Sequence, residues 1–86
     1  MTAYADAVEE SVLAVFSTAS ARQQRHLLNS FRQIAAAPFR ASDYEVEDSS
    51  GRILAVVLRD DWLVTYWCDH AVKRVMIAEI VVVDGS

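Results

Sequence analysis

The feature that most constrains the fold is a series of three apolar segments in the second half of the chain, separated by turns of only a few residues. Residues 52–59, 61–68 and 73–83 are rich in Val, Ile, Leu and aromatic side chains, as strands are. Because short connections join antiparallel neighbours, these segments predict a β-meander. Residues 43–48 alternate apolar and acidic side chains. They predict a fourth strand at a sheet edge, where its charges discourage association with another edge.

Two helical segments precede the strands. In residues 3–18, apolar side chains recur at helical spacing. Residues 20–37 begin with Ser20 and Gln23 at capping-box spacing, and Pro38 predicts the end of this helix. The short link between the two predicts an antiparallel hairpin. We therefore expect an α+β fold in which an N-terminal antiparallel helical hairpin packs on a four-stranded antiparallel β-meander through Val8, Val12, Val15, Leu27, Phe31 and Ile34.

Both faces of the last two strands are apolar. Strict alternation in the final strand places Ile77 and Val81 on one face and Met76 and Ile80 on the other. Such strands are covered on both sides, and the helices can cover only one of them. Hydrophobic residues are 53% of this chain of 86 residues, more than so small a domain can hide. The sequence therefore predicts binding of a partner, or of a second copy, through apolar surface.

Length and composition indicate one soluble domain. A chain of 86 residues fills a single core, so residues 1–86 are taken as one domain. The lone Cys68 has no partner for an internal disulfide, which fits a reducing compartment. The start of the chain lacks the basic and apolar regions of a signal peptide, and no segment has the length of a membrane span. We expect a cytoplasmic protein that does not bind membranes.

The charges are distributed unevenly along the chain, whose net charge is −4. Residues 20–40 contain four arginines and no acid, whereas residues 41–51 contain four acids and no base. Proteins that grip nucleic acid unaided are usually positive overall, so the balance argues against that class. The arginines of the second helix, Arg22 and Arg25 among them, form either an ordinary solvated face or part of a partner-binding surface.

The triplet of Cys68, Asp69 and His70 is the nearest approach to a catalytic motif. Residues two apart on a strand share a face but lie about 6.5–7 Å apart, too far for a thiol–imidazole hydrogen bond. A buried cysteine beside a turn capped by Asp69 is the favoured interpretation. Cys68 and His70 supply only two metal ligands, and His26 has no partner one helical turn away. No metal and no cofactor are predicted.

Two segments resemble the RelE/ParE toxin superfamily: IAAAPF at residues 34–39, which ends the second helix, and LVTYWCDH at residues 63–70, which Lys73 follows. The similarity covers roughly residues 20–82. In that superfamily, toxins of bacterial toxin–antitoxin pairs bind an antitoxin peptide; many RelE-type members cut messenger RNA on the ribosome, and ParE-type members act on DNA gyrase. The resemblance implies a toxin-like component of a type II toxin–antitoxin system, neutralised by a cognate antitoxin, and a RelE-type mRNA interferase as its activity.

Departures from the superfamily pattern leave an alternative open. Leu63 stands where ribonuclease members commonly carry an arginine, and the last strand leads to Asp84 rather than to a basic tail. An initial strand seen in many members is not evident. The alternative is a non-catalytic interaction or dimerisation module of the same fold.

Candidate site residues follow from the resemblance and from the polar groups that remain. Cleavage of RNA by its 2′-hydroxyl needs a base, an acid and cations that stabilise the developing charge. The candidates for catalysis are Arg52, Arg59, Tyr66, His70 and Lys73. The candidates for partner binding are Trp62, Trp67, Arg22 and Arg25, since aromatic side chains without nearby cations favour core or interface over base stacking.

Overall fold

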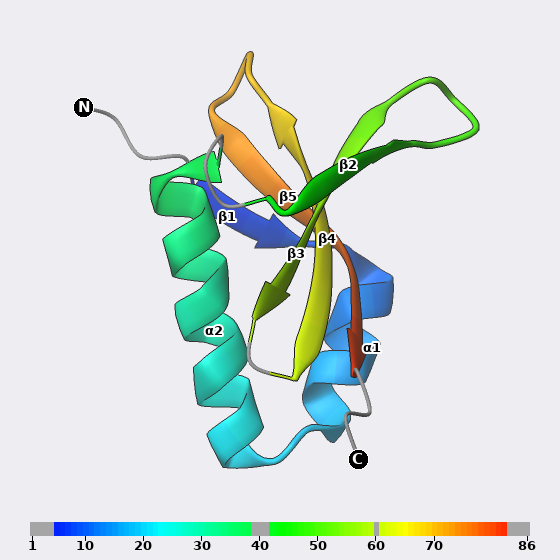
Figure 1. Ribbon diagram of the computed structural model, residues 1–86. Helices are drawn as coiled ribbons and strands as arrows, with labels where there is room; N and C mark the ends of the chain where they lie inside the picture. The colour runs from blue at the N-terminus through cyan, green and yellow to red at the C-terminus, as the bar shows by residue number, and fades with distance from the viewer. Residues whose placement is uncertain (1–4, 39–41, 60, 83–86) are drawn as a thin grey trace.

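The computed structural model describes residues 5–38, 42–59 and 61–82, and in it two helices lie on one side of a five-stranded sheet (Figure 1). The sheet order is β1-β5-β4-β3-β2; β2 to β5 pair antiparallel, and β1 pairs parallel with β5. The α+β class and the meander are confirmed. The four-stranded, fully antiparallel sheet is wrong, because a fifth strand joins its edge. The elements are β1 (Ala5–Val8), α1 (Glu10–Thr18), α2 (Ala21–Ala36), β2 (Tyr44–Glu47), β3 (Ile53–Arg59), β4 (Trp62–Asp69) and β5 (Arg74–Val82).

The start of the chain differs from the expected helix over residues 3–18. Ala5–Val8 form β1, and α1 begins at Glu10. The backbone of β1 pairs with β5, and the Glu9 N–H extends this pairing to the Ile77 carbonyl at 3.0 Å. Four residues carry too little periodicity to separate strand from helix, so pairing with a distant edge decides the outcome. An initial strand is therefore present after all.

The second helix has the predicted start and stop. The Ser20 hydroxyl accepts the Gln23 N–H at 3.1 Å, and the Gln23 side chain accepts the Ser20 N–H at 2.9 Å. This reciprocal pair satisfies two backbone donors and confirms the capping box. The helix ends at Ala36, and Ala37 leaves helical geometry before Pro38.

The core lies between the helices and the sheet. Val12 of α1 and Leu27, Phe31 and Ile34 of α2 are at most 1% exposed, as expected. Val15 is 38% exposed, so its predicted core position is wrong. The short helix buries Val12 fully and its i+4 neighbour, the half-buried Phe16, packs beside it, which leaves Val15 off the buried line. The predicted contribution of Val8 comes from β1 rather than from a helix.

A β-bulge changes which side chains of β5 face the helices. Thr65 lies opposite Glu79 but Tyr66 lies opposite Ile77, so Ala78 is an extra residue in β5. Ile77 and Ile80 consequently both face the core and are at most 4% exposed. The strict alternation expected for this strand is wrong at that point, because a bulge shifts the phase by one residue and leaves no mark in the apolar pattern.

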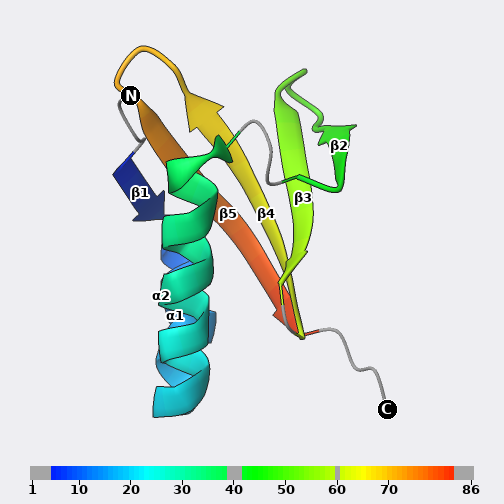
Figure 2. The same ribbon diagram turned by 60° about the vertical axis from the view of Figure 1, so that its left-hand side comes forward.

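The face of the sheet opposite the helices exposes a row of aliphatic side chains. Figure 2 shows both helices on the same side of the sheet. Leu58, Leu63 and Val81 stand in register across β3, β4 and β5, while their chain neighbours Val57 and Val64 pack in the core on the other face. Leu58 is 47% and Val81 45% exposed. We call this surface, with Leu58, Leu63 and Val81 as its central row, the open face.

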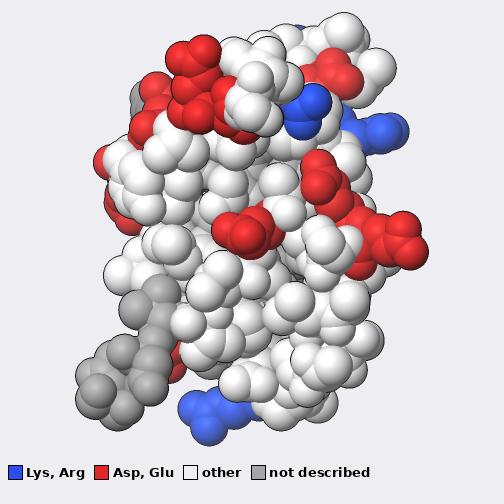
Figure 3. Space-filling view, turned by 90° about the vertical axis from the view of Figure 1, so that its right-hand side faces the viewer, with Lys and Arg blue, Asp and Glu red and all other residues white. Residues whose placement is uncertain are grey.

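The β2–β3 hairpin projects beyond the helices (Figure 1). All four residues of β2 are exposed, and β2 is an edge strand as predicted. Gly51 closes the turn with a φ of 85°, a conformation that glycine adopts without strain. Acidic side chains gather around this hairpin and near the start of α1, whereas the surface over the rest of α1 is almost uncharged (Figure 3). No helix of the described residues is both long and apolar enough to cross a membrane.

Candidate functional site

A cavity of about 280 Å³ lies where β2, β3 and β4 meet the turn after β4. The sheet register explains part of it, because Glu45, Ala55 and Tyr66 lie side by side on three neighbouring strands. Three of the five predicted catalytic residues, Arg52, Tyr66 and His70, line this cavity, which is therefore the candidate functional site. We call it the β2–β4 cavity; its lining residues are Glu45, Arg52, Ile53, Ala55, Tyr66, Trp67, Cys68 and His70.

Arg52 is fixed at the cavity by its backbone and by an aromatic ring. Its N–H donates to the Asp48 carboxylate at 2.9 Å, which ties it to the hairpin turn. Its guanidinium carbon lies 4.3 Å from the centroid of the Trp67 ring, a cation–π contact. The Trp67 indole N–H in turn donates to the Glu9 carboxylate over 3.4 Å. The cation is thus held in place without a direct carboxylate partner among the described residues.

Tyr66 is buried, and its proton is engaged. The hydroxyl donates to the Pro38 carbonyl at 2.7 Å, which links β4 to the end of α2. Burial, and next the nearby Cys68 thiol, raise the pKa of Tyr66 above its usual 10.0. The phenol therefore stays protonated at neutral pH and is no general base. Burial likewise raises the pKa of the Cys68 thiol, which disfavours the thiolate that a nucleophile needs.

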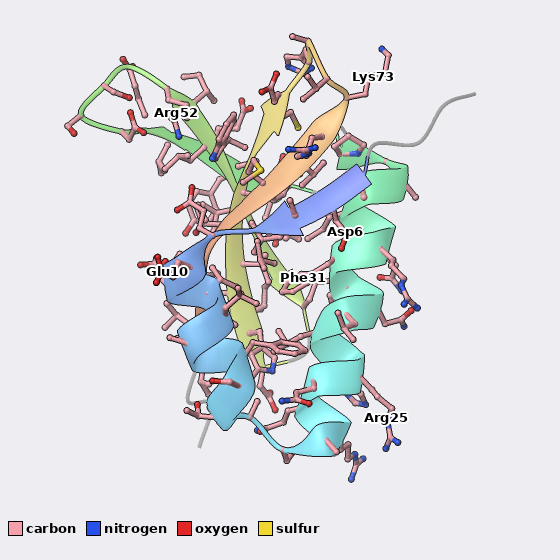
Figure 4. All side chains as sticks on the ribbon, turned by 180° about the vertical axis from the view of Figure 1, so that it is seen from behind. Asp6, Glu10, Arg25, Phe31, Arg52 and Lys73 are labelled. Atoms are coloured by element: carbon pink, nitrogen blue, oxygen red, sulfur yellow. The ribbon has the colours of Figure 1, made fainter. Side chains whose placement is uncertain are left out.

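The other two catalytic candidates lie outside the cavity. Arg59 ends β3, whereas Arg52 precedes that strand, so the two arginines stand about 20 Å apart along it. Arg59 lines a different groove, beside α2. Lys73 lies in the exposed turn between β4 and β5 with a φ of 53°, and its side chain points away from the molecule (Figure 4). The structure therefore does not gather all five candidates at one place, and their catalytic role stays a prediction.

The four candidates for partner binding are dispersed as well. Trp62 is only 6% exposed and belongs to the core. It also lines, with Arg22, a hollow of about 230 Å³. Arg25 projects outward from the lower half of α2 (Figure 4), and Trp67 lies at the β2–β4 cavity. Trp62 and Arg22 share this hollow and the other two candidates lie elsewhere, so the four do not form one surface.

The cavity combines a cation, an imidazole and a carboxylate. Arg52 can neutralise an anion, while His70 adds an imidazole and Glu45 a carboxylate to the lining. Glu45 was expected only to protect the sheet edge. A signal for its position was present in the sequence: Glu45 and Glu47 are two residues apart, so both side chains lie on the same face of β2. Within the described residues, no group of three or more His, Cys, Asp or Glu side chains could hold a metal ion.

Comparison with known proteins identifies the fold. No protein-family model and no curated protein sequence matches this chain. A chain in the crystal structure of the archaeal RelE–RelB complex from Pyrococcus horikoshii is similar with a TM-score of 0.76, at 14% identity, over 99% of this chain and 100% of its own. A chain in the toxin–antitoxin complex RelBE2 from Mycobacterium tuberculosis gives 0.81 at 13% identity, over 95% and 93%. The protein has the RelE-like toxin fold.

Proposed function

We propose that this protein is the toxin-like component of a toxin–antitoxin pair and is neutralised by a cognate antitoxin. The observation that carries the proposal is the shared fold, which extends over nearly the whole of this chain and of chains from two toxin–antitoxin complexes. The likeness covers at least 93% of each of the chains compared.

The open face supports a protein partner. Its central row, Leu58, Leu63 and Val81, presents aliphatic side chains from three adjacent strands that no helix covers. Exposed contiguous apolar surface of this kind marks interaction sites. We assign the open face to the antitoxin, and a second copy of the chain is the competing occupant that the experiment below separates.

Cleavage of messenger RNA is the finer proposal within this role. The β2–β4 cavity would supply Arg52 to stabilise negative charge and His70 to transfer a proton. The protonated Tyr66 hydroxyl is a hydrogen-bond donor rather than a base. If Arg59 and Lys73 also take part, alanine at either position should slow cleavage by about 100-fold or more.

A non-catalytic interaction module of the same fold is the second candidate. The specific observation in its favour is that the cations are dispersed: Arg52 and Arg59 stand at opposite ends of β3. The Tyr66 proton is also engaged by the Pro38 carbonyl. Antitoxin binding without any cleavage of messenger RNA on ribosomes would select this candidate.

A matched pair of substitutions tests the antitoxin surface. Leu58 on the open face and Leu13 on α1 are 47% and 51% exposed, so neither substitution disturbs the core. With the product of an adjacent antitoxin-like gene as the partner, we expect Leu58→Asp to weaken binding by about 30-fold or more, as loss of an interface hot spot does. Leu13→Asp should change it less than about threefold.

The readouts are isothermal titration calorimetry and growth of bacteria that express each variant with the antitoxin. Leu58→Asp should restore growth arrest in the presence of the antitoxin. Loss of binding in Leu13→Asp alone would move the interface to α1. Sedimentation of the isolated protein as a dimer that Leu58→Asp dissociates, without any effect on the antitoxin, would assign the open face to a second copy.

A further inference from the structure

A groove of about 680 Å³ lies between one side of α2 and the end of β3, away from the β2–β4 cavity. Three of the eight described residues that line it are arginines, and none of these eight is acidic, although the chain as a whole carries a net charge of −4. The groove is thus a local concentration of positive charge on an acidic protein. We call it the α2–β3 groove; it is lined by Arg25, His26, Leu28, Asn29, Ser30, Arg32, Gln33 and Arg59.

Arg59 enters the groove with an unsatisfied donor. Its Nε is buried and has no hydrogen-bond partner within the described residues. One terminal nitrogen makes a long bond of 3.4 Å to the Leu58 carbonyl. A guanidinium carries five N–H donors in a fixed plane, and a buried donor left unpaired destabilises the protein that contains it. Arg59 lines the groove, so the N–H groups on its terminal nitrogens are the donors that a ligand there can meet.

Arg25 and Arg32 supply the other two cations. They lie seven residues apart on α2, two helical turns or about 10.5 Å along the axis, and both are exposed. Neither forms an ion pair within the described part of the chain. Asn29 stands between them on the same side and adds amide donors. The described side chains of the groove therefore offer many donors and no carboxylate.

We propose that the α2–β3 groove is a binding site for phosphate groups. A guanidinium can donate two parallel hydrogen bonds to the oxygens of a phosphate. One arginine is enough to bind a carboxylate in this way, so three arginines around one groove favour the more highly charged phosphate. The phosphate belongs either to a free nucleotide or to the backbone of a single-stranded nucleic acid; the recognising chemistry is the same. The inference rests on the groove alone and does not depend on the proposed toxin-like role.

The first test follows the side-chain Nε–H signal of Arg59 by NMR in the full-length protein. Inorganic phosphate, a nucleoside 5′-monophosphate and a 12-nucleotide single-stranded RNA are titrated separately. We expect the Arg59 signal to shift with saturation, because a phosphate on the terminal nitrogens changes the surroundings of the whole guanidinium. An unchanged Arg59 signal with all three ligands would overturn the proposal.

Matched variants separate the site from general attraction to charge. Arg25→Gln and Arg32→Gln should each weaken binding about tenfold, since each removes a charged hydrogen-bond partner. Arg22→Gln is the control: it removes the same charge from the same helix but lies outside the groove. Equal weakening by Arg22→Gln and Arg32→Gln would show diffuse electrostatics and no site.

Further measurements distinguish the ligands. Arg59→Lys keeps the charge but removes the planar set of guanidinium donors. It should weaken phosphate binding while leaving the circular dichroism spectrum unchanged. Tighter binding of the RNA than of the mononucleotide identifies the polymer as the ligand. In that case the slope of log K against log salt concentration should become less steep by about 0.7 in Arg32→Gln, because one phosphate contact is lost. Equal affinities identify free phosphate. Tighter binding of a polyglutamate peptide than of any phosphate would replace the proposal with a carboxylate site.

Discussion

The two ends of β3 lie in different surroundings. Val57, near its end, is fully buried among the helices and the neighbouring strands, whereas Ile53, at its start, is 52% exposed in the projecting hairpin. The first half of the strand pairs with β2, whose residues are all exposed. β3 thus begins in a region held mainly by its backbone hydrogen bonds and its turn, and it continues into a region held by buried side chains.

The turn of the hairpin compensates for the missing core. The Asp48 carboxylate accepts the N–H groups of Ser50 and Arg52 at 2.9 Å each and the Ser50 hydroxyl at 2.6 Å. The Gly51 N–H donates to the Asp48 carbonyl at 3.0 Å. The β2–β4 cavity spans the boundary, since Arg52 comes from the turn and Tyr66 from the core. Its geometry therefore depends on local turn stability as well as on packing.

The largest expected effect lies on the packed side. Phe31, 1% exposed, points into the space between the helices and the sheet (Figure 4). Phe31→Ala should lower the free energy of unfolding by about 3–5 kcal/mol, because it leaves a cavity in the core. Leu58→Ala on the open face is the control and should cost less than about 1 kcal/mol. Urea denaturation measures both, and similar losses for the two would contradict the division into packed and open sides.

Tyr66 sits at the boundary and should show an intermediate effect. Tyr66→Phe leaves the Pro38 carbonyl without its donor, so the free energy of unfolding should fall by about 1–3 kcal/mol at pH 7. Tyr44→Phe, on the exposed edge strand, is the control and should be nearly neutral.

The alkaline pH dependence tests the same residue separately. The pKa of Tyr66 is raised in the folded state, so its contribution is complete below the ordinary value of 10.0 and is lost as the pH rises above it. Tyr66→Phe should therefore flatten the loss of stability above pH 10 that the unaltered protein shows in thermal melts. An equally steep loss in the variant would mean that other groups cause it.

Sequence periodicity predicted the parts of the fold that local interactions decide. The capping box at Ser20 and the end of α2 before Pro38 each depend on residues close in sequence. β1 and the bulge at Ala78 depend on pairing with distant strands. The four residues of β1 are too few to show a period, and the extra residue of the bulge does not change the apolar character of β5.

The candidate site was predicted in part for the same reason. Arg52, Tyr66 and His70 were named from the resemblance and from the polar groups that remain, and the cavity brings them together. The contact of Tyr66 with Pro38 spans 28 residues and has no sequence signal. Arg59 was grouped with them because of the resemblance, and the structure places it at the far end of β3.

On the hairpin side, a substitution should act locally. Gly51→Ala places a methyl group 3.7 Å from the Glu47 carboxylate, an ordinary contact, so its cost arises from the positive φ and amounts to about 1–2 kcal/mol. Amide hydrogen exchange in β2 and the start of β3 should accelerate, while exchange at Val57 and Val64 stays unchanged if the hairpin opens independently. Ser49→Ala, in the same turn, is the control. Uniform acceleration across the sheet would show that the hairpin and the core unfold together.

The smallest effect concerns the charge of Asp48. The Ser50 hydroxyl, and next the Arg52 N–H, hold the pKa of Asp48 below its usual 3.8. Because the folded pKa is the lower one, this carboxylate stabilises the turn above pH 3.8 and ceases to do so as the pH falls through its folded value. Amide exchange in the hairpin should therefore rise relative to the core on acidification toward pH 2. Asp48→Asn, which keeps a side-chain acceptor, should remove that dependence, whereas Asp61→Asn outside the hairpin should not. A carboxyl carbon of Asp48 that titrates at or above 3.8 would rule out the turn as the element that anchors Arg52 at the cavity.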